Sequence, residues 1–149
     1  MEMVDEDVDA FLQASGRADD LVALDALIVD ALPGVSRVLW RGKMWGGTDQ
    51  AIIGYGLIRQ PRPRGADVQW FLVGLAGQKK HLSVYVNAAE AGSYLVQQRA
   101  SDLGRVKVGA AAVTFGSVAD LDLLQFRALL VRAREITPDT QADDGGASR

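Results

Sequence analysis

Strict alternation of apolar and polar residues in the middle of the chain is the feature that most constrains the fold. From position 81 the chain reads His-Leu-Ser-Val-Tyr-Val. Successive side chains of a strand point to opposite faces, so this pattern predicts a half-buried β-strand. Leu82, Val84 and Val86 are expected to be buried in a core, and His81 and Ser83 are expected on the opposite face.

The periodicity of the other segments predicts an α+β fold. Apolar residues recur at helical spacing in four segments and at strand spacing in five others. The expected helices are 4–13, 17–32, 88–100 and 120–135, and the expected strands are 35–41, 51–58, 67–76, 82–86 and 105–115. In the third helix, Asn87 and Glu90 have the spacing of a capping box. In the strand at 51–58, Gly54 and Gly56 leave one face bare, for a bulge or for close approach of another group.

These elements predict one domain over residues 1–136. We expect a mostly antiparallel sheet of about five strands, with the two N-terminal helices and the C-terminal helix packed mainly on one face. Residues 137–149 have no bulky apolar side chain, and they are expected to form a disordered polar tail. The basic segment 59–65, with its two prolines, is expected to be an exposed loop.

The C-terminal helix carries two apolar stripes, and a helix covering one sheet needs only one of them. The stripes are Leu121, Leu124, Ala128, Val131 and Leu123, Phe126, Leu130, Ala133. One stripe should cover the sheet. We expect the second to be covered as well, either by the helix at 88–100 or by a second copy of the chain, which would make a homodimer through the C-terminal helix.

The composition of the chain limits the classes of protein to which it can belong. The 149 residues include no cysteine, which excludes disulfide frameworks, thiolate metal sites and cysteine nucleophiles and fits a reducing cytosol. The acidic N-terminus does not resemble a secretory signal, and no apolar run approaches the roughly 18 residues of a membrane span. We therefore expect a cytoplasmic protein with no membrane partner.

The charges are segregated along the chain. Residues 1–30 hold nine acidic side chains and one basic, whereas residues 31–110 hold eleven basic and four acidic. The basic middle could form a surface for an anionic ligand, or the two groups could pair with each other. A sequence pI of about 5.1 argues against nucleic acid as the partner.

Several segments together resemble the YdhG-like family of domains of unknown function. They are the acidic first helix, a longer helix ending in Leu-Pro, Gly-Tyr-Gly in a strand, Lys-Lys-His entering a strand at 79–81, and Gly-Arg-Val-Lys-Val-Gly at 104–109. The resemblance spans residues 4–135 and implies an α+β domain with an antiparallel sheet. Some members of the family are described as frataxin-like iron-binding proteins, so it also implies iron as an alternative cofactor.

Two binding functions follow, both without catalysis. His81 and Ser83 lie roughly 7 Å apart on one strand face, too far for a hydrogen-bonded catalytic pair, so we expect a binding protein rather than an enzyme. The first hypothesis is a small anionic ligand on an aromatic and basic face. Its candidate residues are Trp40, Tyr55, Lys80, His81, Tyr85 and Lys107. The alternative is iron held by acidic helix residues, Asp5 and Asp9, because hard cations prefer oxygen ligands.

Overall fold

The computed structural model describes residues 1–43, 49–60, 65–66 and 68–137. Its elements follow one another in the order β1 (Glu2–Val4), α1 (Val8–Ala14), α2 (Ala18–Ala31), β2 (Arg37–Lys43), β3 (Asp49–Gln60), β4 (Val68–Gly77), β5 (Leu82–Val86), β6 (Ala89–Glu90), β7 (Ser93–Tyr94), α3 (Leu95–Gln98), β8 (Lys107–Val108), β9 (Ala112–Phe115) and α4 (Leu123–Glu135). Short 3-10 turns lie at Ala100–Asp102 and Val118–Asp120. The predicted tail, apart from residue 137, and positions 61–64 of the predicted basic loop lie outside the described residues.

An antiparallel sheet of seven strands forms the centre of the α+β fold, in the order β1-β2-β3-β4-β5-β9-β8. The sequence predicted about five strands, and six of the seven correspond to those segments, because the segment 105–115 forms two strands, β8 and β9, separated by a turn. The strand that was not predicted is β1, which pairs with β2. The strands β1 and β8 lie at the sheet edges, where a strand needs a hydrogen-bonding partner on one side only.

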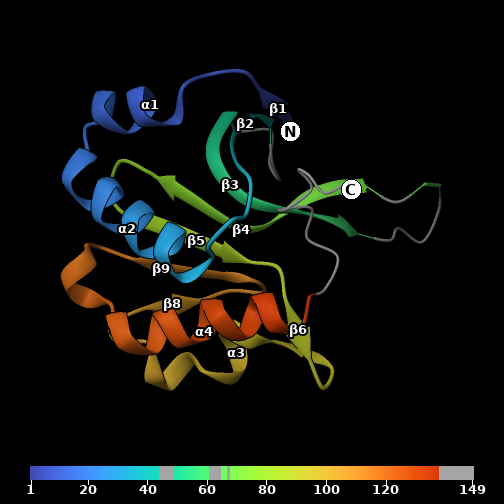
Figure 1. Ribbon diagram of the computed structural model, residues 1–149. Helices are drawn as coiled ribbons and strands as arrows, with labels where there is room; N and C mark the ends of the chain where they lie inside the picture. Colours follow the sequence, from blue (N-terminus) through green and yellow to red (C-terminus); the bar gives the residue numbers. More distant parts are fainter. Residues whose placement is uncertain (44–48, 61–64, 67, 138–149) are drawn as a thin grey trace.

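The helices cover one face of the sheet (Figure 1). Leu24 and Ile28 of α2 and Phe126 and Leu130 of α4 are fully buried, and they belong to the same core cluster as the strand residues that point toward them. Those strand residues include Leu82, Val84 and Val86, each 0% exposed. The register predicted for β5 is therefore confirmed, with Ser83 on the opposite face.

The first helix begins later than the sequence predicted. Instead of starting at Val4, α1 starts at Val8, and the Asp7 side chain caps it by accepting a hydrogen bond from the Asp9 backbone N–H at 3.1 Å. A capping carboxylate satisfies a helix N–H that has no partner within the helix. The residues before the cap are therefore free to extend, and Met3 pairs with Trp40 of β2.

The helix predicted at 88–100 is wrong over its first half. Ala89–Glu90 and Ser93–Tyr94 form a two-stranded hairpin, and only Leu95–Gln98 is helical. The Asn87 side chain donates to the Phe71 carbonyl of β4, at 2.9 Å, and not to a helix end. The loop residues Ala91 and Gly92 have φ of 54° and 90°. Positive φ at both positions is the requirement of a tight two-residue hairpin turn.

The C-terminal helix α4 turns its second stripe, not its first, toward the core. Phe126, Leu130 and Ala133 are 0% exposed and contact the core within one chain, as the sequence predicted for a covered stripe. In the other stripe Leu121 is buried, but Leu124 and Val131 are 75% and 37% exposed, so the expectation that both stripes are covered is wrong. Leu123 is also exposed, at 42%. Among the described residues, no helix is both long enough and apolar enough to cross a membrane.

The hairpin turn provides a stability prediction. Ala91 holds a left-handed backbone conformation, which costs an L-residue with a Cβ roughly 1–2 kcal/mol and is tolerated better by asparagine. Ala91→Asn should therefore raise the free energy of unfolding by roughly 1 kcal/mol, measured by urea denaturation. Ala89→Asn, at an exposed strand position of the same hairpin, is the matched control and should bring no gain. Equal effects of the two substitutions would contradict the left-handed backbone conformation of Ala91.

Candidate binding site on the helix-free face of the sheet

The face of the sheet opposite the helices carries a second apolar cluster. Its buried members are Trp40, Ile52, Phe71 and Ala76, and its partly buried members are Met1, Leu57, Trp70 and Tyr85. No residue of a described helix belongs to this cluster. We call this side the helix-free face. Among the described residues, its large side chains therefore pack mainly against the sheet and against one another.

Two glycines in neighbouring strands make room for the rings. Gly54 of β3 pairs with Gly74 of β4, and Gly74 pairs in turn with Tyr85 of β5. A Cβ atom on Gly54 would lie 2.5 Å from Nε1 of Trp40, and one on Gly74 would lie 2.5 Å from Cε1 of Phe71. Such distances are too short for any side chain. The two rings therefore lie directly on the glycine backbone, which explains why the sequence leaves this face of β3 bare.

The aromatic rings pack against one another in a continuous group. Trp70 stacks on Phe71 with centroids 4.5 Å apart, and Trp40 meets both of them edge-on at 5.4 and 5.5 Å. Tyr85 lies 6.5 Å from Phe71, with the two rings tilted by 58°. Aromatic pairs at these separations and tilts are favourable beyond the area they bury. Phe71 and Trp40 are buried, whereas Trp70 and Tyr85 remain partly exposed and are the rings that a ligand could reach.

A group of polar side chains adjoins the aromatic rings on β5 and β9. Ser83 lies two residues from Tyr85 on the same face and pairs across the sheet with Thr114, and its hydroxyl donates to Oε1 of Gln78 at 3.1 Å. Partial burial raises the pKa of Tyr85, while hydrogen bonding with Ser83 and Gln78 acts in the opposite direction. The Tyr85 hydroxyl is therefore a neutral hydrogen-bonding group at neutral pH, at the boundary between apolar and polar surface.

Three of the residues predicted for ligand binding share this face. Trp40 belongs to the aromatic cluster, Tyr85 lies at its edge, and Lys107 is exposed on β8, paired in register with Thr114. The other basic candidates lie apart from them. Lys80 and His81 are exposed in the turn before β5, and His81 is four residues from Tyr85, about 13 Å along a strand.

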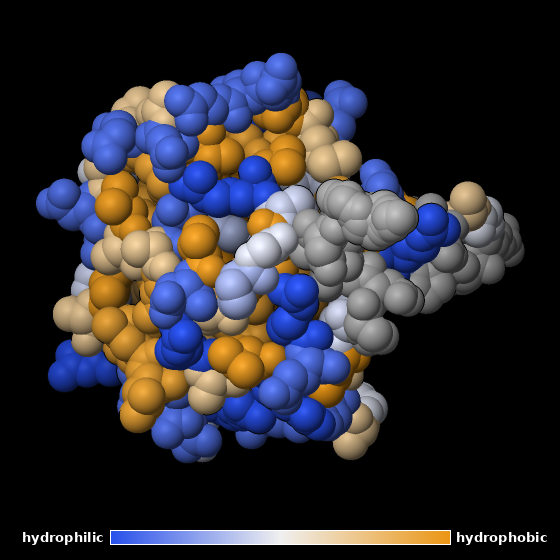
Figure 2. Space-filling view, in the orientation of Figure 1, coloured by the Kyte–Doolittle hydropathy of each residue, from blue (hydrophilic) through white to orange (hydrophobic). Residues whose placement is uncertain are grey.

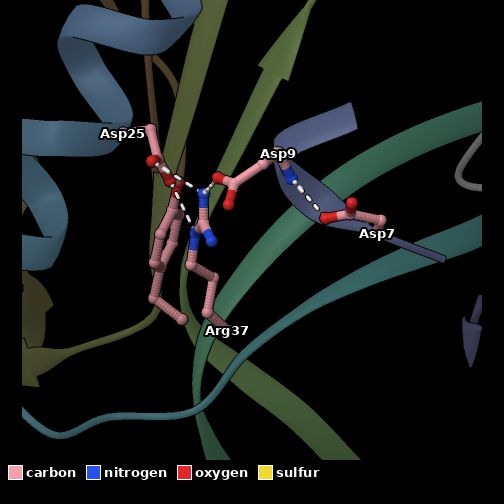
Figure 3. Close-up of polar contacts among 5 residues, drawn as sticks. Asp7, Asp9, Asp25 and Arg37 are labelled. Atoms are coloured by element: carbon pink, nitrogen blue, oxygen red, sulfur yellow. Dashed lines mark hydrogen bonds and ion pairs between the residues drawn. The ribbon is translucent and has the colours of Figure 1, made fainter. Parts of the chain in front are cut away.

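Tyr55, the sixth candidate, lies on the opposite face and is fully buried. Its hydroxyl donates to Oδ1 of Asp25 at 2.7 Å, and the same carboxylate accepts two hydrogen bonds from the Arg37 guanidinium, each 2.9 Å long. Arg37 also donates to Asp9 at 2.7 Å (Figure 3). We call Asp25, Arg37 and Tyr55 the buried polar network. A group fully occupied in this way belongs to the core, so Tyr55 does not join Trp40 and Tyr85.

The switch in the face that β3 presents explains why the sequence misplaced Tyr55. Tyr55 and Ile58 both contact the helix-side core, whereas Leu57 contacts the helix-free cluster, so the simple alternation breaks between 55 and 58. Gly56 lies at this point with φ of 77°, a conformation that glycine adopts readily. The sequence pattern contains Gly56 but does not show which of its neighbours changes sides.

The acidic residues predicted for the iron alternative lie near the start of α1. Asp9 is bonded to Arg37, and Asp5 is exposed. Within the residues that the structure describes, no group of three or more His, Asp or Glu side chains is arranged to hold a metal ion. Iron binding by Asp5 and Asp9 stays a prediction of the sequence.

Trp70, Phe71, Gly74 and Ser83 help to build the candidate site, although they are not among the residues that the sequence predicted for it. The signal for the first three was present in β4, whose segment reads Gln-Trp-Phe-Leu-Val-Gly-Leu-Ala and is apolar at consecutive positions. A strand apolar on both faces needs a cover on each side. Once the helices are assigned to one face, the large residues on the other face become the candidates.

Comparison of the chain with protein-family models, with curated proteins and with solved structures found no match. The resemblance to the YdhG-like family therefore remains a prediction. What the site does must be argued from its own residues.

The close contact of Phe71 with Gly74 predicts an intolerant glycine. Gly74→Ala forces the Phe71 ring away from the strand, and overpacking of this kind typically costs about 1–3 kcal/mol. Gly109→Ala is the matched control, because a Cβ there would meet no atom within 4 Å. Thermal denaturation should show a lower midpoint for the Gly74 variant alone. An unchanged midpoint would mean that the ring does not lie on this glycine.

The buried polar network predicts a pH effect at the alkaline end. Burial raises the pKa of Tyr55 well above its ordinary value of 10.0, and the Asp25 carboxylate raises it further. The unfolded chain loses the Tyr55 proton near pH 10, while the folded chain keeps it. The contribution of the protonated Tyr55 to the free energy of unfolding is therefore complete below pH 10 and declines as the pH rises beyond it.

Tyr55→Phe should remove that part of the decline and make the free energy of unfolding less dependent on pH above 10. At neutral pH the substitution should cost about 1–3 kcal/mol, because a buried carboxylate loses one hydrogen bond. Tyr94→Phe, a partly buried tyrosine in β7, is the control. Urea denaturation at pH values from 8 to 11 tests the prediction. It would be refuted if the free energy of unfolding changed equally with pH in the unmodified protein, the Tyr55→Phe variant and the Tyr94→Phe variant.

Proposed function

We propose that the protein binds a small ligand with a flat apolar part and an anionic or hydrogen-bonding group, on the helix-free face beside Tyr85. The observation that carries this proposal is the position of Tyr85. Its ring is 6.5 Å from Phe71 in the aromatic cluster, and Ser83 and Gln78 hydrogen-bond beside it. Binding sites typically combine an apolar surface with a few polar groups in this manner.

The apolar part of the ligand would contact the two partly exposed rings, Trp70 and Tyr85. A flat ring system can stack on such a surface at little entropic cost to the protein, because Trp70 is already fixed against Phe71. The polar end would reach the hydroxyl group of Thr114, which is partly exposed, whereas Ser83, 3.5 Å from it, is buried and would support the site from beneath the surface. Lys107, opposite Thr114, supplies a positive charge at that end and favours an anion.

The proposal assigns no catalytic step. The described residues gathered at Tyr85 carry hydroxyl, amide and aromatic groups and, at Lys107, an ammonium group, and His81 lies just before the far end of β5 rather than among them. A hydroxyl nucleophile would need a base within hydrogen-bonding distance, and Ser83 is bonded to the amide oxygen of Gln78, which is not a base. Binding without chemistry is therefore the function that we infer for this face.

A ligand screen with matched variants tests the proposal. Naphthalene-2-sulfonate and indole-3-acetate are flat anions that should bind, measured by calorimetry, whereas inorganic phosphate lacks the flat part and should bind more weakly. Tyr85→Phe should weaken binding of the flat anions by roughly 0.5–1.5 kcal/mol, the value of one hydrogen bond, which is about 2- to 12-fold. Trp70→Leu should weaken binding by removing the stacking ring.

Two controls keep the result specific. Tyr94→Phe removes a phenol from the hairpin, outside the proposed site, and should leave the affinity unchanged. Lys80→Gln removes a positive charge from the turn instead of from the site, so it should weaken anion binding less than Lys107→Gln does. Absence of binding, or affinities that are equal in the Tyr85, Trp70 and control variants, would contradict the proposal.

A further inference from the structure

One exposed apolar side chain lies outside the helices. Among the described residues, six large apolar side chains are exposed, and five of them are on α2 and α4, where Figure 2 shows hydrophobic residues among polar ones over the helix layer. The sixth is Met3 of β1, which is 40% exposed. Its partner across the strand pair is Trp40, which is only 3% exposed. An accessible thioether side chain is therefore the cross-strand neighbour of a buried indole ring.

The side chains of Met1 and Met3 both lie on the helix-free face. Val4 packs against the helix-side core, and because side chains of a strand alternate between the two faces, positions 3 and 1 point the other way. Met1 belongs to the helix-free cluster, and its Sδ atom lies 3.4 Å from the position of a Cβ added to Gly42. The two methionines therefore cover the edge of the aromatic cluster at Trp40, where the sheet ends.

Few contacts hold β1 to the sheet. It pairs with β2 over three residues and has no described strand on its other side, as its place at the sheet edge in Figure 1 shows. The chain after it is tied to β2 by the exposed ion pair of Glu6 and Arg41, and exposed ion pairs contribute little to stability. Such short edge elements open locally without unfolding of the domain. A small loss of packing at Met3 is therefore enough to shift β1 toward the detached state.

Oxidation of the thioether would cause that loss of packing. The sulfur lone pair attacks one oxygen of hydrogen peroxide, the O–O bond breaks, and the proton on the transferred oxygen passes to the departing hydroxide, which leaves as water. The sulfur loses two electrons and the peroxide gains them. The resulting sulfoxide is polar, so it can pack against an indole ring only by giving up hydrogen bonds with water.

We propose that Met3 is a reversible oxidation site, and that its sulfoxide form releases β1 from β2 and uncovers Trp40. In the reduced chain β1 covers this ring, whereas in the oxidised chain β2 is the edge of the sheet. Methionine sulfoxide reductases reverse the modification, which makes it suitable as a switch. Trp40 contacts Trp70 and Phe71, so the switch would act on the face where we place the ligand, but it requires no ligand itself.

Peptide mass mapping and hydrogen–deuterium exchange of the full chain, before and after hydrogen peroxide, test the proposal. The reaction is stopped when the average chain has gained one oxygen atom, and Met3 should carry most of it. Exchange in residues 1–6 and 37–42 should then become at least about fivefold faster, because β1 opens more often, while residues 82–86 at the centre of the sheet should be unchanged. Treatment with reductases for both sulfoxide epimers should restore the slow exchange.

Three variants make the result specific. Met3→Leu keeps an apolar side chain that peroxide does not oxidise, so its exchange should not respond to the treatment. Met3→Gln imitates the polarity of the sulfoxide and should exchange rapidly in β1 and β2 without oxidant. Leu124→Gln makes the same change at a position 75% exposed on α4 and should leave exchange in β1 and β2 slow.

Three results would overturn the proposal. In the first, Met1 or Met44, the other methionines of the chain, takes up the oxygen in place of Met3. In the second, oxidised Met3 leaves exchange in β1 and β2 unchanged, which would mean that the sulfoxide is accommodated where it is. In the third, peroxide accelerates exchange in the Met3→Leu variant as much as in the unmodified protein, which would place the sensitive group elsewhere.

Discussion

The structure depends on one constraint: the central strands are apolar on both faces, but the helices cover only one. On the helix side, α2 and α4 bury Tyr55, Val73 and Val84 in the larger core. On the other side the sheet covers itself, because Trp40 and Phe71 fold down onto the two glycines of β3 and β4. Large rings lying flat on glycine bury apolar surface without a second layer of helices. The aromatic cluster that results is also where we place the ligand.

The buried polar network explains how the N-terminal helices are fixed in place over the sheet. A carboxylate in a core is costly unless its oxygens are bonded, and Asp25 accepts from both Arg37 and Tyr55. The network joins α2 to β2 and β3, and Asp9 extends it to α1. Arg41 adds a further ion pair with Glu6 on the same side of the sheet edge. These contacts orient helices whose apolar side chains alone would tolerate some sliding.

The segregation of charge along the chain has a structural meaning in this arrangement. Acidic residues of the first 30 positions pair with basic residues from later in the chain, as in Arg37 with Asp9 and Asp25, Arg41 with Glu6, and Arg127 with Asp30. Of the two interpretations of the charge pattern, internal pairing accounts for these arginines. Fewer basic side chains are therefore left to bind an anion, and Lys107 is a basic residue that lies on the helix-free face. A ligand there would rely on aromatic contact as much as on charge.

The sequence by itself determined the elements whose signal is local. Alternation from Leu82 to Val86 fixed the register of β5, and Asp7, a residue type that prefers the N-cap position, caps α1. Local signals failed where a distant partner competed: the Asn87 side chain bonds to β4 instead of capping a helix, and α4 turned the stripe containing Phe126 inward. Tertiary structure alone decided that Tyr55 belongs to the core and that Trp40, Phe71 and Tyr85 meet on one face. The physical reason is that a face is chosen by what packs against it, and the packing partners lie in strands and helices remote in sequence.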